Sequence, residues 1–190
     1  MSKKYEFTDE TITVNGITLH RIKALIDFDR FGVKAGDLGG FIEVEANLSH
    51  DGNAWVYGDA LVYGNARVSE NAKVFPDALV YGNANVYGNA CVSGNALVSG
   101  NAWIYGNAKV SGDAKIKRSN DYACVNGVGS VYKNTTFFRC EDDSIRAQCG
   151  GFYGTIDEFR AKVKETHGES KYAKEYLMIA DLMEYHFAED

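Results

Sequence analysis

The sequence has a single proline among 190 residues, whereas glycine occurs 20 times. Such a glycine content without proline is typical of β structure with many turns rather than of a disordered linker. The sequence also lacks any apolar run of the ~20 residues that are needed to cross a bilayer. We therefore expect no membrane span and no membrane partner.

Nothing near the start of the chain resembles the apolar core of a signal peptide, because the first residues lead directly into an alternating, strand-like stretch. We therefore expect a cytoplasmic protein, in which cysteines remain free thiols. The cysteines lack the close spacing of a metal-binding motif, so we expect no metal and no cofactor. They are Cys91, Cys124, Cys140 and Cys149.

A dominant basic surface is also missing from the sequence. The chain carries a net charge of −6, and its acidic excess is concentrated after Glu141. Proteins that bind nucleic acid polymers usually present a basic face that displaces counterions from the phosphates. We therefore expect that no nucleic acid polymer is a partner.

What the sequence does contain is an internal repeat. From Asp51 to Ile116 it consists of eleven consecutive six-residue units without an insertion. The third residue of each unit is Asn or Asp, the fourth is Ala, and the sixth is Val or Ile. Two degenerate units precede the regular ones, with Ile42 and Leu48 at the position of the alanine.

A period of six fits short strands joined by corners, and it fits neither an α-helix nor a plain alternating strand. Three units would close one triangular coil of about 18 residues, stacked about 4.8 Å from the next coil. Val and Ala are two residues apart and point inward, while the Gly-Asn or Gly-Asp pair accepts the positive φ of a corner. The pattern therefore predicts a parallel β-helix with ladders of Asn side chains.

The first two parts of the chain are a cap and the β-helix itself. Residues 1–38 contain a two-residue hairpin signal at Asn15-Gly16. We expect this β-hairpin to cover the open N-terminal end of the repeat, as the terminal units of repeat arrays must. The β-helix itself is assigned to residues 39–118.

The third part, residues 119–190, is expected to be an α+β segment. A β-hairpin is expected within residues 128–150, followed by two α-helices. The first helix starts at the capping box Thr155–Glu158. The second runs from about Ser170 to Phe187, with apolar residues at helical spacing.

The repeat resembles that of hexapeptide-repeat proteins, whose units form a left-handed parallel β-helix. Its V-x-G-N-A-x-V form is similar to uncharacterised transferase-like hexapeptide proteins of bacteria and of phage or prophage genomes, and so are residues 34–43 and 166–168. The resemblance implies a mainly β protein and, for a phage-encoded chain, the host cell cytoplasm. We expect a homo-oligomer, with a trimer favoured. Such a repeat specifies fold far more than function.

Histidine is absent from the regular units, and this weighs against catalysis. The resemblance implies that an acyltransferase of this family would use a coil histidine as its general base, and His50 is the one plausible candidate. Three histidines on adjacent coils, as a zinc site would need, are missing. Cys91 has no histidine one coil away. We therefore favour a protein that is not an enzyme.

The outward positions, taken every third unit, form three stacked faces. One face, the leucine face, is expected to be buried by the C-terminal helices or by a neighbouring subunit. It comprises Leu61, Tyr63, Leu79, Tyr81 and Leu97.

The two other faces mix aromatic rings with cations. This composition suits subunit packing and, as the second interpretation, a ligand pocket at the subunit boundary. The predicted ligand-binding residues are Trp55, Tyr57, Arg67, Lys73, Tyr87, Trp103 and Tyr105. A basic cluster that could bind an anion ends the repeat, and it contains Lys109, Lys115, Lys117 and Arg118.

Three functional hypotheses remain. The first is a non-catalytic oligomer that binds a small anionic or nucleotide ligand at its subunit clefts, in its sharpest form a phage protein that sequesters a host immune signal. The second is an acyl- or acetyltransferase of the hexapeptide family. The third is a purely structural or protein-interaction scaffold, which the uninterrupted repeat favours.

Overall fold

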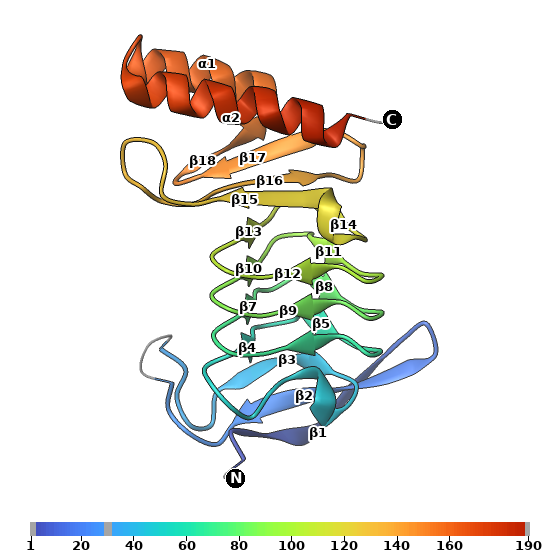
Figure 1. Cartoon of the computed structure of the whole chain (residues 1–190). Coiled ribbons are helices and arrows are strands. Elements are labelled where there is room, and N and C mark those ends of the chain that lie inside the picture. The colour runs from blue at the N-terminus through green and yellow to red at the C-terminus, as the bar shows by residue number, and fades with distance from the viewer. Residues whose placement is uncertain (1–2, 29–31, 189–190) are drawn as a thin grey trace.

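The computed structural model describes residues 3–28 and 32–188 and shows a mainly β protein. A parallel β-solenoid of about four turns forms the middle of the molecule. Figure 1 shows an N-terminal hairpin at one end of the solenoid, and an antiparallel sheet with two helices at the other. In the described part of the chain, neither helix combines the length and apolar character that a bilayer crossing requires.

Two-residue strands recur every six residues along the solenoid and stack into three parallel sheets. The sheets contain the orders β5-β8-β11-β14, β4-β7-β10-β13 and β6-β9-β12. The strands are β4 (Trp55–Val56), β5 (Leu61–Val62), β6 (Arg67–Val68), β7 (Lys73–Val74), β8 (Leu79–Val80), β9 (Asn85–Val86), β10 (Cys91–Val92), β11 (Leu97–Val98), β12 (Trp103–Ile104), β13 (Lys109–Val110) and β14 (Lys115–Ile116).

The repeat produces this stacking because each coil places identical residues on top of one another. Val56 pairs with Val74, and Val62 pairs with Val80. The repeated Ala and the repeated Val or Ile are at most 1% exposed from Ala54 to Ile116. The predicted interior of the solenoid is therefore confirmed.

Asparagine ladders run along the corners, as the sequence predicts. The Asn65 amide donates to the Asn83 side-chain oxygen at 3.0 Å, and Asn83 donates to Asn101 at the same distance. Asn53 donates to Asn71 at 2.9 Å in a second ladder. These bonds satisfy polar groups that would otherwise lie between closely stacked coils.

Two corners depart from the glycine pattern and keep a positive φ by other means. Pro76 occupies a glycine position, and since proline fixes φ near −65°, the positive φ moves to Asp77 at 70°. Glu70 stands in place of glycine with a φ of 59°. Its carboxylate accepts a hydrogen bond from the Gly88 backbone N–H at 3.0 Å.

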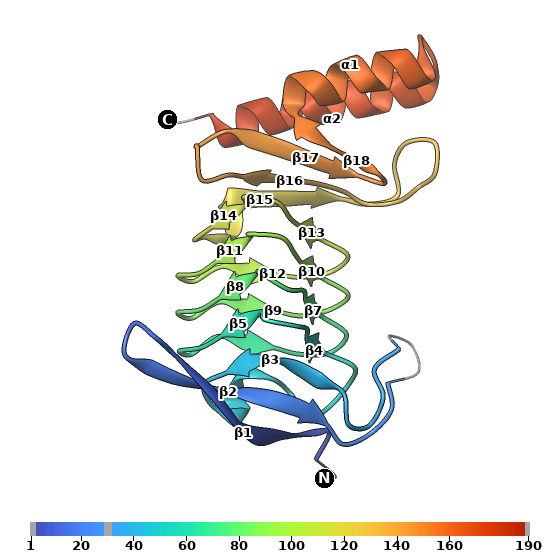
Figure 2. The same ribbon diagram turned by 180° about the vertical axis from the view of Figure 1, so that it is seen from behind.

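The N-terminal hairpin forms as predicted and joins the solenoid through one of its sheets. β1 (Tyr5–Val14) and β2 (Ile17–Ala24) are antiparallel, and β2 pairs with β3 (Leu38–Ile42). β3 then pairs in parallel with β5. Figure 2, in which the molecule is seen from behind, shows the hairpin crossing this end of the solenoid.

The placement of the two degenerate units was wrong. Ile42 pairs with Val62, and Leu48 bridges to Val68, so both occupy the position of the valine rather than that of the alanine. The intervening turn contains the 3₁₀ helix η1 (Glu45–Asn47). The register differs because the large side chains fill the wide interior, whereas the alanine site beside the corner is too narrow for them.

The C-terminal part contains more strands than the predicted hairpin. After the 3₁₀ helix η2 (Ser119–Asp121), four antiparallel strands follow in sequential order. The hairpin prediction missed the two outer strands, because short strands carry a weak pattern. The strands are β15 (Tyr122–Val125), β16 (Thr135–Arg139), β17 (Ile145–Cys149) and β18 (Phe152–Thr155).

Both predicted helices are confirmed and lie on the outer face of this sheet (Figure 1). α1 (Ile156–His167) begins at the predicted capping box, in which the Thr155 hydroxyl accepts from the Glu158 N–H. α2 (Lys171–Phe187) begins after the N-cap Ser170. Successive side chains of β16 point to opposite faces of the sheet. Phe138 therefore packs on the core of the solenoid, while Phe137 packs in the separate core under the helices.

Two glycine-to-alanine variants should separate the two demands that a corner makes. At Gly106 (φ 67°) a Cβ would meet no atom within 4 Å, so Gly106→Ala should lose only about 1 kcal/mol from the positive φ. At Gly82 (φ 70°) a Cβ would lie 3.1 Å from the Gly100 backbone nitrogen. Gly82→Ala should therefore lose about 1–3 kcal/mol more. Urea denaturation measures the loss of unfolding free energy in both variants. Equal losses would contradict the expectation that the close approach of stacked coils adds to the effect of the positive φ.

Candidate functional site

The three outward faces are confirmed by the strand pairing. Trp55, Lys73, Cys91 and Lys109 stack in one column, and each pairs with the equivalent residue of the next coil. Arg67, Asn85 and Trp103 form a second column, and Leu61, Leu79 and Leu97 a third. The predicted ligand-binding residues thus fall on two separate faces.

Trp55 does not belong to an accessible site. Its side chain is 1% exposed and packs against Phe28 and Tyr5, with ring centroids 5.3 and 6.3 Å away. The prediction treated Trp55 as an outward residue of a bare coil. It is wrong because the N-terminal segment covers the first coil.

The neighbours of Trp55 on this face are also drawn into packing. Tyr57 is half-buried and stacks on Phe75 with ring centroids 4.9 Å apart. Burial raises the pKa of Tyr57 to about 12. Lys73 is half-buried between Trp55 and Cys91 in the same column. These contacts leave little of this face for a ligand in a single copy.

The other mixed face keeps an exposed aromatic cluster. Trp103 and Tyr105 are 53% and 51% exposed, and the Tyr105 ring stacks on Tyr87 at 5.5 Å. Arg67 is exposed at the far end of the same column. The structure therefore brings together three of the seven predicted ligand-binding residues, with Arg67 two coils away.

The N-terminal hairpin, rather than the C-terminal helices, packs on the leucine face. Leu19, Phe41 and Tyr63 form a buried cluster there, against which Leu61 and Leu79 are packed. Ile12, Val14, Ile17 and Tyr81 complete this cluster. The buried cluster of the helices is a separate one, so their expected role on this face is wrong. Cover by a neighbouring subunit stays a prediction, and Leu97 is still half-buried.

His50 is engaged in packing and not poised as a base. Its Nδ1 accepts a hydrogen bond from the Lys4 backbone N–H at 3.1 Å, and its ring stacks on Tyr5 at 4.3 Å. Burial lowers its pKa. The Lys4 ammonium lies beside it and donates to the Ala54 carbonyl at 2.9 Å, while burial lowers the pKa of Lys4 to about 8. Both groups close the N-terminal end of the solenoid.

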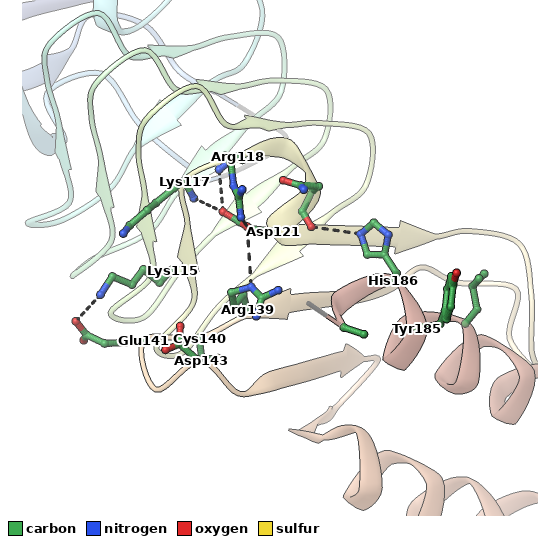
Figure 3. A pocket seen from close by; sticks show the side chains of 13 residues that line it. Lys115, Lys117, Arg118, Asp121, Arg139, Cys140, Glu141, Asp143, Tyr185 and His186 are labelled. Carbon is green, nitrogen blue, oxygen red and sulfur yellow. Dashed lines mark hydrogen bonds and ion pairs between the residues drawn. The ribbon is translucent and has the colours of Figure 1, made fainter. Parts of the chain in front are cut away.

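The most promising cavity lies at the other end, where the solenoid meets the C-terminal sheet and α2 (Figure 3). It is a groove of about 1220 Å³. Three residues of the predicted basic cluster, Lys115, Lys117 and Arg118, line it together with Arg139 of β16. His186 of α2 forms the opposite wall (Figure 3). We refer to this cavity as the basic groove.

Acidic residues neutralise part of the basic groove. Asp121 is buried, and its carboxylate lies 3.3 Å from the Arg118 guanidinium and 4.0 Å from that of Arg139. The same carboxylate accepts hydrogen bonds from two backbone N–H groups at 2.9 Å. Lys115 pairs with Glu141 at 3.2 Å. Asp121 thus fixes the η2 turn and orients the two guanidinium groups.

The ammonium group of Lys117 is available to an anionic ligand in the groove. Among the described residues, none forms an ion pair with its ammonium group. The exposed Lys115–Glu141 pair is weak, because both groups are solvated, and an anion could displace Glu141. The arrangement can therefore hold an anionic group by charge-assisted hydrogen bonds.

The groove also contains one thiol and one imidazole, but they do not form a catalytic pair. The Cys140 side chain is buried, and burial raises the pKa of its thiol. The His186 Nε2 lies 3.3 Å from the Asn120 carbonyl oxygen. Across residues 3–28 and 32–188, no three His, Cys, Asp or Glu side chains converge as a metal site would need.

Sequence reasoning found one wall of the basic groove and missed the other. Lys115, Lys117 and Arg118 are adjacent in the chain and carry an obvious charge signal. Arg139 and His186 come from distant elements, and no local pattern connects them with the end of the repeat. Lys109, the fourth member of the predicted cluster, stacks on Cys91 in another column.

Comparison with known families supports the fold. Residues 54–70 and 90–106 are similar to the family described as the YdcK β-solenoid repeat. Both segments lie within the stacked coils. The chain is a β-solenoid repeat protein. The comparison with curated proteins finds no match.

The burial of His50 predicts a pH dependence of stability. Because its pKa is lowered in the fold, its contribution is complete above the unfolded pKa of about 6.5 and is lost as the pH falls below it. His50→Asn keeps a hydrogen-bond acceptor for the Lys4 N–H but cannot be protonated in this range. The free energy of unfolding should fall more steeply for the original chain than for His50→Asn between about pH 7.5 and 5.5. If urea titrations showed the same pH dependence of the unfolding free energy for both chains, this role of His50 would be refuted.

Proposed function

We propose that this β-solenoid protein is a non-catalytic binding protein that holds a small anionic ligand, such as a nucleotide, in the basic groove. The observation that carries the proposal is the meeting of Lys117, Arg118 and Arg139 in one cavity lined on its far side by α2. A cavity of about 1220 Å³ is large enough for a ligand of nucleotide size. The proposal moves the expected ligand from the solenoid faces to the end of the solenoid.

Among the described residues, the candidates considered as a general base are engaged in other contacts, and this proposal therefore favours binding over turnover. His50, the candidate general base, already accepts a hydrogen bond through Nδ1 from Lys4 of the N-terminal segment and stacks on Tyr5. The thiol of Cys140, which lines the groove, is buried, and the imidazole of His186 is in contact with a carbonyl oxygen. We therefore expect a bound ligand to be released chemically unchanged.

A scaffold role is the second candidate, favoured by the exposed cluster of Trp103 and Tyr105. Aromatic side chains of this kind anchor protein interfaces, and the uninterrupted solenoid holds them rigidly. The left-handed hexapeptide class and the origin in a phage are further proposals that rest on the resemblance of the repeat.

Lys117→Ala is the sharpest test of the proposed ligand site. Only the Lys117 backbone N–H bonds to Asp121, so removal of the side chain should leave the fold intact. Calorimetric titration with inorganic pyrophosphate and with nucleotides should show binding to the original chain. Lys117→Ala should weaken it about 5- to 10-fold, as expected for the loss of one charge-assisted contact.

Lys133→Ala provides the matched control, because Lys133 is exposed and does not line the groove. Its affinity should equal that of the original chain. Equal losses in both variants would indicate only a general charge effect. Failure of every anion to bind would overturn the proposal and leave the scaffold role, and a ligand recovered in altered form after denaturation would point to an enzyme.

A further inference from the structure

The basic groove has two ends of different chemistry. Figure 3 shows Lys115 and Lys117 at one end of the groove and Tyr185 and His186 of α2 at the other. Leu182, three residues before Tyr185, also lines the groove. Spacings of three and four residues place these α2 side chains on one face of the helix. That face therefore gives the groove one aliphatic side chain and two planar rings in addition to its cations.

Contacts with other parts of the groove hold the last turn of α2 in place. The Arg139 guanidinium donates to the Phe187 carbonyl oxygen at 3.1 Å and lies 5.8 Å from the centre of the Phe187 ring. The His186 Nε2 lies 3.3 Å from the Asn120 carbonyl oxygen of η2. These contacts join α2 to β16 and to the turn at the end of the solenoid. The wall that carries Tyr185 is therefore positioned relative to the cations before a ligand binds, which lowers the entropy cost of binding.

The charges that line the groove leave only a small positive excess. Four lysine or arginine side chains line it, and so do three aspartate or glutamate side chains. The lining therefore carries an excess of one positive charge when His186 is neutral. Such an excess suits a ligand with few phosphate groups, and its attraction is screened by salt. Further affinity has to come from the uncharged wall of the groove.

Tyr185 offers an open aromatic surface on that wall. The Tyr185 side chain is 83% exposed and that of Leu182 is 57% exposed, so neither closes over the groove. An acyl chain leaves water only when an apolar cavity encloses it. A planar base, in contrast, needs one ring face on which to stack. The open wall therefore suits a nucleobase better than an aliphatic tail.

We infer that the basic groove takes a nucleoside phosphate, with its phosphate on Lys117 and Arg118 and its base stacked on Tyr185. This assignment rests on the proposed function and names within it the class of ligand and the residue that selects it. The cations supply charge-assisted hydrogen bonds to the phosphate, and the ring supplies stacking energy that an inorganic anion cannot gain. Tyr185 thus distinguishes a nucleotide from an inorganic phosphate.

Tyr185→Ala separates the contributions of the two ends. Calorimetric titration of the full chain compares inorganic pyrophosphate with adenosine diphosphate, which has two phosphate groups as well and adds a nucleoside. The original chain should bind adenosine diphosphate about 10-fold more tightly than pyrophosphate. Tyr185→Ala should remove this advantage and leave the affinity for pyrophosphate unchanged, because the side chain is exposed and takes no part in the anion contacts. Tyr185→Phe keeps the ring and should keep the advantage.

Met178→Ala is the matched control, because it removes an exposed side chain of the same helix that does not line the groove. Both affinities should equal those of the original chain. An advantage of adenosine diphosphate that survives Tyr185→Ala would overturn the inference, and so would equal binding of both ligands by the original chain. In either case pyrophosphate binding would leave the proposed anion site standing, whereas failure of both ligands to bind would overturn the two together. Tighter binding of octyl phosphate than of adenosine diphosphate would indicate an aliphatic ligand and would also overturn the inference.

Discussion

The close stacking of identical coils is the constraint on which the rest of this structure depends. Adjacent coils are about 4.8 Å apart, which leaves room for a Val layer inside, an Ala beside each corner and little space for a Cβ at most of the stacked corner glycines. Gly82 illustrates this, because a Cβ there would press on the backbone of Gly100. A regular six-residue unit satisfies all these conditions at once, and the Asn ladders satisfy the polar groups that remain.

A stacked solenoid has two open ends, and the flanking segments close them with different chemistry. At the N-terminal end, Lys4 and Tyr5 donate hydrogen bonds to backbone carbonyls of Ala54 and Leu48. At the C-terminal end, Phe138 of the antiparallel sheet completes the solenoid core. Closed ends protect the outer coils from pairing with other chains.

The same regularity explains where a ligand site can form. Within the coils each outward residue is flanked above and below by its equivalents, so a face offers ladders rather than a cavity. Where the repeat stops, side chains of different elements converge, and there Lys117, Arg139 and His186 line one groove.

Much of this protein was determined by its sequence alone. The period of six, the inward Val and Ala and the Asn ladders depend on neighbours in a repeating pattern, and the structure confirms them. The hairpin at Asn15-Gly16 and the capping box at Thr155 are local signals, and they are confirmed as well.

The tertiary structure decided what covers the solenoid and what meets at its ends. Trp55 has the pattern of an outward residue, yet Phe28 and Tyr5 bury it. Ile42 and Leu48 keep the period of six in the sequence but take the place of valine in the coil. The physical reason is that burial and register at the ends depend on contacts between segments far apart in the chain. A repeat specifies only the contacts that it makes with itself.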